Sequence, residues 1–164
     1  MTGALLRIDI TGRNGVKLRD RGSEGPKTCI GMAVSGFPNM FIITGPGSPS
    51  VFTDMVISIE QHVDWIADCI AQLKKNGFSA IGATPEAEDK WVTHVNEVAS
   101  RTMMPNANSW YVGANVPGKP RIFMPYLGGR RSTRGTSTTS RARITKASGW
   151  PKPAQTRRED QSAK

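Results

Sequence analysis

A Gly/Pro-rich turn at residues 44–50 carries the groups best suited to hold a ligand. Its sequence is Thr-Gly-Pro-Gly-Ser-Pro-Ser, and it lies between an apolar run and a strong helical pattern. Glycine lets bare main chain approach a ligand closely. The first turn of a following helix adds unpaired N–H groups and a partial positive charge. The turn therefore indicates the edge of a cofactor site, although most Gly/Pro turns before a helix only redirect the chain.

Other side chains with chemical potential are fewer. Trp110 lies in a Gly/Asn/Pro-rich stretch off any periodic face, and its indole offers a stacking surface and one N–H donor. His62 and His94 titrate near neutrality, but both fall inside helical patterns without a suitably spaced carboxylate, so we interpret them as structural. Cys29 and Cys69 lack the spacing of a disulfide framework or zinc site and the basic surroundings that activate a thiol.

Three apolar runs predict the strands that deliver the chain to this turn. They cover residues 5–10, 28–34 and 40–43, and residues 12–15 form a turn after the first. The third run is continuous, which is typical of a strand buried on both faces of a parallel sheet. Because ligands in open α/β sheets bind at the carboxyl ends of the strands, this pattern supports a site at the glycine turn.

Two helices are predicted after the turn. The first opens near residues 55–58 and stops at residues 76–77, with acidic residues early and lysines late. Its apolar residues recur in steps of three and four and define one face: Ile59, Val63, Ile66, Ile70 and Leu73. The second begins at Thr84 as N-cap with Pro85 following. Trp65 and Trp91 lie on these helices and are predicted to be packing residues.

The positive charge of the chain is confined to its last residues. The 164 residues, 37% of them hydrophobic, suit one domain with a net charge of +9. Residues 130–164 hold ten Lys/Arg against two acidic residues, a balance of +8, and few apolar side chains, so we expect disorder there. Such a tail binds phosphates non-specifically, but Trp150 is its one aromatic residue, which argues against base recognition. With no leader or membrane-length apolar run, we expect a cytoplasmic protein away from membranes.

Several blocks of this sequence resemble a known family of flavoenzymes. They are Phe-Pro-Asn-Met-Phe-Ile-Ile-Thr-Gly-Pro-Gly-Ser-Pro-Ser at residues 37–50, Ser-Ile-Glu-Gln-His-Val-Asp-Trp-Ile at residues 58–66, and the stretches at residues 107–120 and 123–129. In order and spacing they resemble the C-terminal third of the single-component Baeyer-Villiger monooxygenases, which include cyclohexanone, phenylacetone and steroid monooxygenases. The resemblance covers residues 4–129.

The resemblance implies an α/β fold and a fragment. Residues 1–104 would be the C-terminal portion of a Rossmann-like FAD/NAD(P)-binding domain, residues 105–129 an extended substrate and NADP arm, and residues 130–164 a disordered basic tail, possibly out of frame. No G-x-G-x-x-G phosphate turn occurs. The family's F-x-G-x-x-x-H-x-x-x-W fingerprint is also absent, as is the region of its catalytic arginine. The fragment is therefore expected to carry no catalytic residue of its own.

The resemblance also assigns site residues. FAD and NADP contacts fall on five residues: Gly45, Pro46, Gly47, Met55 and Trp110. The substrate pocket falls on six: Pro49, Ser50, Phe52, Met55, Phe123 and Met124. The whole enzyme would use NADPH and O2 to insert oxygen beside a ketone, with no metal. The alternatives are a non-catalytic truncated product, or a module that binds nucleic acid or acidic surfaces through its basic tail.

Overall fold

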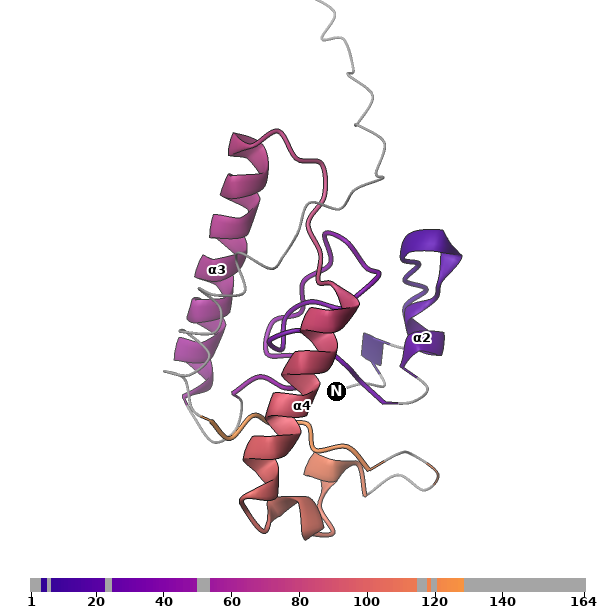
Figure 1. Cartoon of the computed structure of the whole chain (residues 1–164), viewed down its shortest axis with the longest axis vertical. Coiled ribbons are helices and arrows are strands. Elements are labelled where there is room, and N and C mark those ends of the chain that lie inside the picture. Colours follow the sequence, from indigo (N-terminus) through magenta and orange to yellow (C-terminus); the bar gives the residue numbers. More distant parts are fainter. Residues whose placement is uncertain are drawn as a thin grey trace, which may run out of the picture.

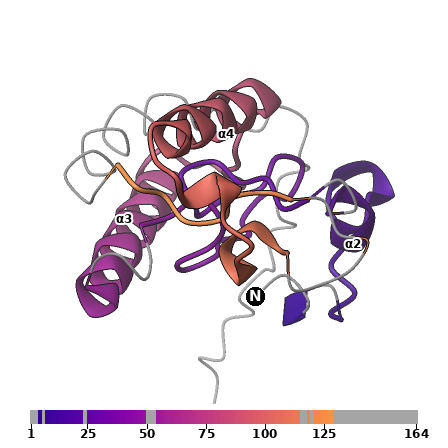
Figure 2. The same cartoon turned by 90° about the horizontal axis from the view of Figure 1, so that it is seen from below.

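Two long helices and the irregular segment packed against them make up most of the structure. The computed structural model describes residues 4–5, 7–22, 25–49, 54–114, 118 and 121–128. Helix α3 spans Met55–Lys75 and α4 spans Pro85–Ser100, while α2 is a single turn at Leu18–Arg21. Short 3-10 turns are η1 at Arg13–Gly15, η2 at Met104–Asn106 and η3 at Trp110–Val112. Both predicted helices are present, and α2 lies at the opposite edge from α3 (Figures 1 and 2).

The strand predictions are wrong. Within the described residues, 5–10, 28–34 and 40–43 form no strand. Residues 28–34 instead make a tight turn, closed by one bridge between Cys29 and Ala33, because Ile30 (φ 50°) and Gly31 (φ 74°) are left-handed. The turn predicted at residues 12–15 is confirmed as η1, which a second isolated bridge encloses. The apolar residues of 28–34 are buried along a loop, whereas Ile8 and Ile43 of the other two runs are 57% and 45% exposed.

Local capping explains where the long helices begin and end. Asp54 caps α3, and its carboxylate accepts two backbone N–H groups of the first turn at 3.0 and 3.4 Å. The helix ends at Lys75, with Asn76 as C-cap followed by Gly77 at φ 64°, which matches the predicted stop at residues 76–77. Thr84 caps α4 through its hydroxyl, with Pro85 in the first helical position. None of the described helices is long and apolar enough to cross a membrane.

The face of α3 that is buried is not the one predicted. Its buried residues are Ser58, His62, Trp65 and Cys69. Three members of the predicted aliphatic face are exposed, namely Ile59 at 37%, Val63 at 46% and Ile70 at 42%. The helix turns its Trp/His face toward the core, and of the predicted aliphatic face only Ile66 packs against the main core cluster. Ile59, Val63 and Ile70 are therefore left in water, and a patch of exposed aliphatic side chains is typical of a contact surface.

The main core joins both helices to the loop at residues 25–49 and to Tyr126. It consists of eight buried residues: Cys29, Ile30, Met32, Trp65, Cys69, Trp91, Val95 and Tyr126. Trp65 and Trp91 are 3% and 4% exposed, which confirms them as packing residues. Two smaller clusters lie around Leu18 and Phe37 and around Ala99 and Phe123. The tail at residues 130–164, for which we predict disorder, lies outside the described residues.

Glu88 connects α4 to the loop and to α2. It is fully buried and accepts the Ser35 N–H at 2.9 Å and the Arg21 guanidinium at 2.6 Å.

We expect Glu88→Ala to lower the free energy of unfolding by about 2–3 kcal/mol, because a buried N–H loses its charged acceptor. Urea unfolding measures this. Glu97→Ala, at an exposed position of the same helix, is the control and should change stability by less than about 0.5 kcal/mol; equal losses would contradict the role of Glu88.

Candidate functional site

Hydrogen bonds bring together three segments that are distant in sequence. The Gly47 N–H donates to the Met124 carbonyl at 2.6 Å, and the Tyr126 N–H donates to the Ser48 carbonyl at 3.0 Å. The Met124 N–H in turn donates to the Tyr111 carbonyl at 3.0 Å, in the 3-10 turn η3. Backbone hydrogen bonds therefore connect the glycine turn, residues 123–126 and η3.

Four of the five predicted cofactor contacts, Gly45, Pro46, Gly47 and Trp110, lie in these connected segments. Gly45 and Pro46 are buried and Gly47 is half-buried, with a left-handed φ of 76°. Trp110 is 54% exposed, and its ring lies 4.1 Å from that of Tyr111, centroid to centroid, at an interplanar angle of 30°. The indole thus keeps one face and its N–H available to a ligand.

The predicted substrate residues are divided between the core and the surface. Pro49 is fully buried, while Met124 is half-buried. Phe123 is 6% exposed and packs in the cluster with Ala99 and Val112, at the border of a hollow of about 410 Å³ beside the C-terminal half of α4. A hollow of that size is within the range of ligand pockets. Of the other three predicted residues, Met55 is 37% exposed at the start of α3, and Ser50 and Phe52 lie outside the described residues.

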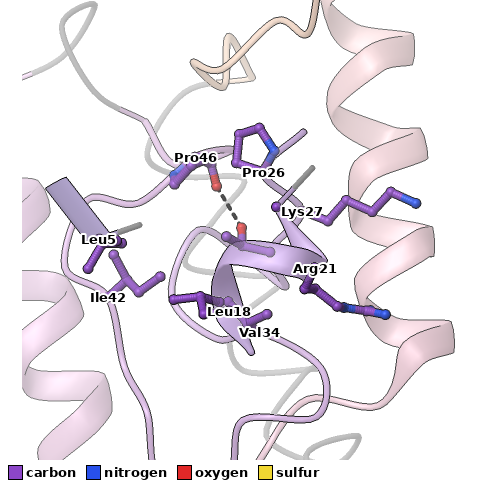
Figure 3. Close-up of a pocket in the computed structure, with 10 residues that line it drawn as sticks. Leu5, Leu18, Arg21, Pro26, Lys27, Val34, Ile42 and Pro46 are labelled. Atoms are coloured by element: carbon purple, nitrogen blue, oxygen red, sulfur yellow. Dashed lines mark hydrogen bonds between the residues drawn. The ribbon is translucent and has the colours of Figure 1, made fainter. Parts of the chain in front are cut away.

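The glycine turn is held from beneath by the preceding loop. The Gly45 N–H donates to the Gly31 carbonyl at 3.0 Å, and the Thr28 hydroxyl donates to the Pro46 carbonyl at 2.6 Å, the dashed line in Figure 3. From α4, the Trp91 indole N–H donates to the Gly47 carbonyl at 3.0 Å. These bonds fix the path of the backbone, since the described residues form no sheet to hold it. The Trp91 contact was missed in the sequence because the pattern shows only a helical packing residue.

A small apolar pocket lies beside Pro46. Figure 3 shows its lining, which includes Leu5, Leu18, Val34 and Ile42. Its volume is about 70 Å³, far below the roughly 300–1,000 Å³ of a ligand pocket. The pocket therefore contributes packing under the turn and is no cofactor site by itself.

The start of α3 differs from the expected electropositive helix end. The Asp54 carboxylate binds the Val56 and Ile57 N–H groups and brings its own negative charge, and the Ser58 N–H donates to the Asp54 carbonyl. Among the described residues, the Met55 N–H has no acceptor. One donor therefore remains for a ligand at the helix start. An aspartate immediately before a helical pattern is the sequence signal that identifies this cap.

Both histidines are structural, as predicted, and the structure adds their partners. His62 is 3% exposed, and its Nδ1 accepts the Thr44 N–H at 3.0 Å. Burial lowers the pKa of His62 below its usual value, which keeps the ring neutral and this nitrogen free to accept. His94 lies 2.9 Å from the Tyr126 hydroxyl through Nε2. Neither pairing joins neighbours in sequence, so no local pattern reveals it.

The cysteines do not form a reactive centre. Both are free and buried. Burial, with a smaller contribution from the Glu88 charge, raises the pKa of the Cys29 thiol to about 11, which confirms that this thiol is not an activated nucleophile. Within the described ranges, no three His, Cys, Asp or Glu side chains gather as metal ligands.

Solved structures with the same fold define the class. No family model matches the chain. It superposes on oxidized steroid monooxygenase bound to NADP with a TM-score of 0.77 and 45% identity, over 87% of this chain and 26% of that one. Cyclohexanone monooxygenase from Rhodococcus sp. Phi1 bound to NADP+ gives a TM-score of 0.79 at 38% identity, over 85% and 26%. The fold is therefore that of part of an FAD/NADP-binding monooxygenase, which confirms the coarser part of the predicted fold class.

Sequence relatives narrow this class further. Cyclohexanone 1,2-monooxygenase of Acinetobacter sp. is 42% identical over 132 residues, and acetone monooxygenase of Gordonia sp. strain TY-5 is 43% identical over 129. The chain is thus a homologue of the Baeyer-Villiger monooxygenases, as its sequence blocks predict. The match covers 80% and 78% of this chain, but it spans only 24% of each relative.

Proposed function

We propose that this chain is the C-terminal portion of a Baeyer-Villiger monooxygenase, an enzyme that inserts one oxygen atom of O2 beside a ketone at the expense of NADPH. Residues 1–104 would belong to the FAD-binding domain and residues 105–129 to the arm that borders substrate and NADP. One observation carries this proposal: residues 47, 124 and 111 are joined by consecutive backbone hydrogen bonds. Those bonds unite the three segments in which the family resemblance places cofactor and substrate.

The described residues fit the ring edge of FAD but not its phosphates. The backbone at Gly47 is only half-buried, and the Met55 N–H is a donor without a described acceptor, so both can border a flat ring. No G-x-G-x-x-G turn is present for the pyrophosphate. When bound, FAD supplies the oxygen-transfer chemistry. The role of this chain is to orient the ring edge and, through buried Pro49 and Phe123, to exclude water beside it.

Trp110 is the group proposed to meet NADP and substrate. Its exposed indole provides a stacking face and a donor next to Tyr111, whose carbonyl accepts the Met124 N–H. Solved relatives described as bound to NADP share this part of the fold. A nicotinamide ribose or a ketone held by Trp110 would thus contact segments that are connected to the proposed flavin edge.

The exposed aliphatic stripe of α3 supports a larger enzyme. Relatives are about four times as long as the matched segment. We propose that the rest of such a monooxygenase covers Ile59, Val63 and Ile70, which the described chain leaves in water. We also place the enzyme in the cytoplasm, where free cysteines persist.

A chimera tests the proposed function. Residues 4–128 of this chain would replace the matching quarter of the Acinetobacter cyclohexanone monooxygenase, to which it is 42% identical over 132 residues. We expect the chimera to bind FAD and to consume NADPH in a ketone-dependent manner, with lactone as product. A folded chimera that retains FAD yet forms no lactone from any tested ketone would show that these segments do not make the site.

The isolated chain should not retain FAD. Without a phosphate turn, only contacts to the ring edge remain, and these are too few to offset the cost of binding. We therefore expect a colourless protein after purification in the presence of excess FAD. Absorbance near the flavin maximum measures occupancy, and the chimera serves as the positive control. Stoichiometric yellow protein would contradict the expectation.

A further inference from the structure

The backbone at the start of the glycine turn adopts a conformation that its sequence does not favour. Thr44 has φ 52°, in the left-handed region that β-branched residues rarely enter. Gly45, the next residue, is packed tightly against the preceding loop, since a Cβ there would lie 2.6 Å from the Gly31 carbonyl oxygen. Something other than local preference must hold Thr44 in place.

The bond from Thr44 to α3 supplies that restraint. The Thr44 N–H donates to Nδ1 of His62 at 3.0 Å across 18 residues. His62 is 3% exposed and lies on the buried face of α3 with Trp65 and Cys69, so its ring is fixed by the core. Since Nδ1 accepts, the proton of the neutral ring is on Nε2.

We propose that His62 is a positioning residue, whose Nδ1 lone pair holds Thr44 in its left-handed conformation and so sets the path of residues 45–49. Helix α3 thereby fixes the turn from one side, while the Trp91 bond to Gly47 fixes it from α4. Only the consequence for flavin rests on the proposed function. The restraint itself is a property of this chain and can be measured without cofactor.

Amide hydrogen exchange of the 164-residue chain, followed by NMR, tests the restraint. In His62→Asn, Oδ1 is two covalent bonds from Cβ, as Nδ1 is in histidine, so an acceptor is kept. His62→Phe fills the space without an acceptor. The internal reference is the Ile42 N–H, which donates to the Met32 carbonyl at 2.7 Å. We expect the exchange rate of Thr44 relative to Ile42 to rise about tenfold in His62→Phe, as loss of one hydrogen bond implies, and about twofold or less in His62→Asn.

His94→Phe is the matched control, because it removes the other helical histidine and should leave the Thr44 ratio unchanged. An unchanged ratio in His62→Phe, or equal rises in His62→Phe and His62→Asn, overturns the proposal. If His62→Phe does not fold, the double variant His62→Phe with Thr44→Gly is tested instead, since glycine adopts positive φ without a Cβ conflict. The combined variant should fold, and its failure to do so overturns the proposal. Loss of oxygenation in the chimera, by contrast, bears on the proposed function alone.

Discussion

Replacing Trp110 with alanine in the chimera should reduce ketone oxygenation roughly ten- to a hundred-fold while FAD stays bound. The indole is 54% exposed and belongs to η3, which backbone hydrogen bonds connect to the glycine turn through Met124. Its loss removes one oriented donor and a stacking face, which amounts to about 1–3 kcal/mol of positioning energy. FAD is held mainly by the phosphate turn of the remaining enzyme, so its occupancy should not follow the rate.

The measurement is lactone formation per bound flavin. Trp110→Phe keeps an aromatic face without the N–H and should fall between the wild type and Trp110→Ala. Met103→Ala is the control, because Met103 is 87% exposed and lies before η2, away from the hydrogen bonds of the site. If FAD is lost in proportion to activity, Trp110 is a packing residue and its assignment to NADP and substrate is wrong.

Helix positions were predictable from the sequence because their signals are local. Thr84 with Pro85 marks the start of α4, and Asn76 with Gly77 marks the end of α3. The buried face of α3 was not predictable. The helix carries an aliphatic stripe and a Trp/His stripe, and which one meets the core depends on residues far along the chain. Hydrophobic periodicity ranks the stripes by hydropathy alone, so it favoured the stripe that the structure leaves exposed.

The strands were wrong for a related reason. A short apolar run is equally compatible with a buried strand and with a buried loop. At residues 28–34 the left-handed backbone of Ile30 and Gly31 decides for a loop, and nothing in the residue types reveals a positive φ at an isoleucine. The meeting of Gly47 with Met124 spans 77 positions, so no local pattern predicts it. Only the family resemblance placed the two segments in one site.

Gly31→Ala should be among the most destabilising single substitutions in this chain. Gly31 has φ 74°, and a Cβ there would lie 2.5 Å from the Ser48 Cβ and 2.9 Å from the Ser48 Cα. The substitution therefore combines left-handed strain, about 1–2 kcal/mol, with overpacking against backbone, about 1–3 kcal/mol. We expect a total loss of about 2–5 kcal/mol in the free energy of unfolding, measured by urea denaturation.

Gly36→Ala separates the two contributions. Gly36 has φ 87°, in the same region of backbone conformation, but a Cβ there would meet nothing within 4 Å. This variant should show the conformational strain alone, about 1–2 kcal/mol. The excess in Gly31→Ala then measures how tightly the loop at residue 31 presses against Ser48, whose carbonyl accepts the Tyr126 N–H. Equal losses in the two variants would mean that the backbone moves apart at residues 31 and 48 when a Cβ is added. A turn that moves so readily could not hold a flavin edge in one place.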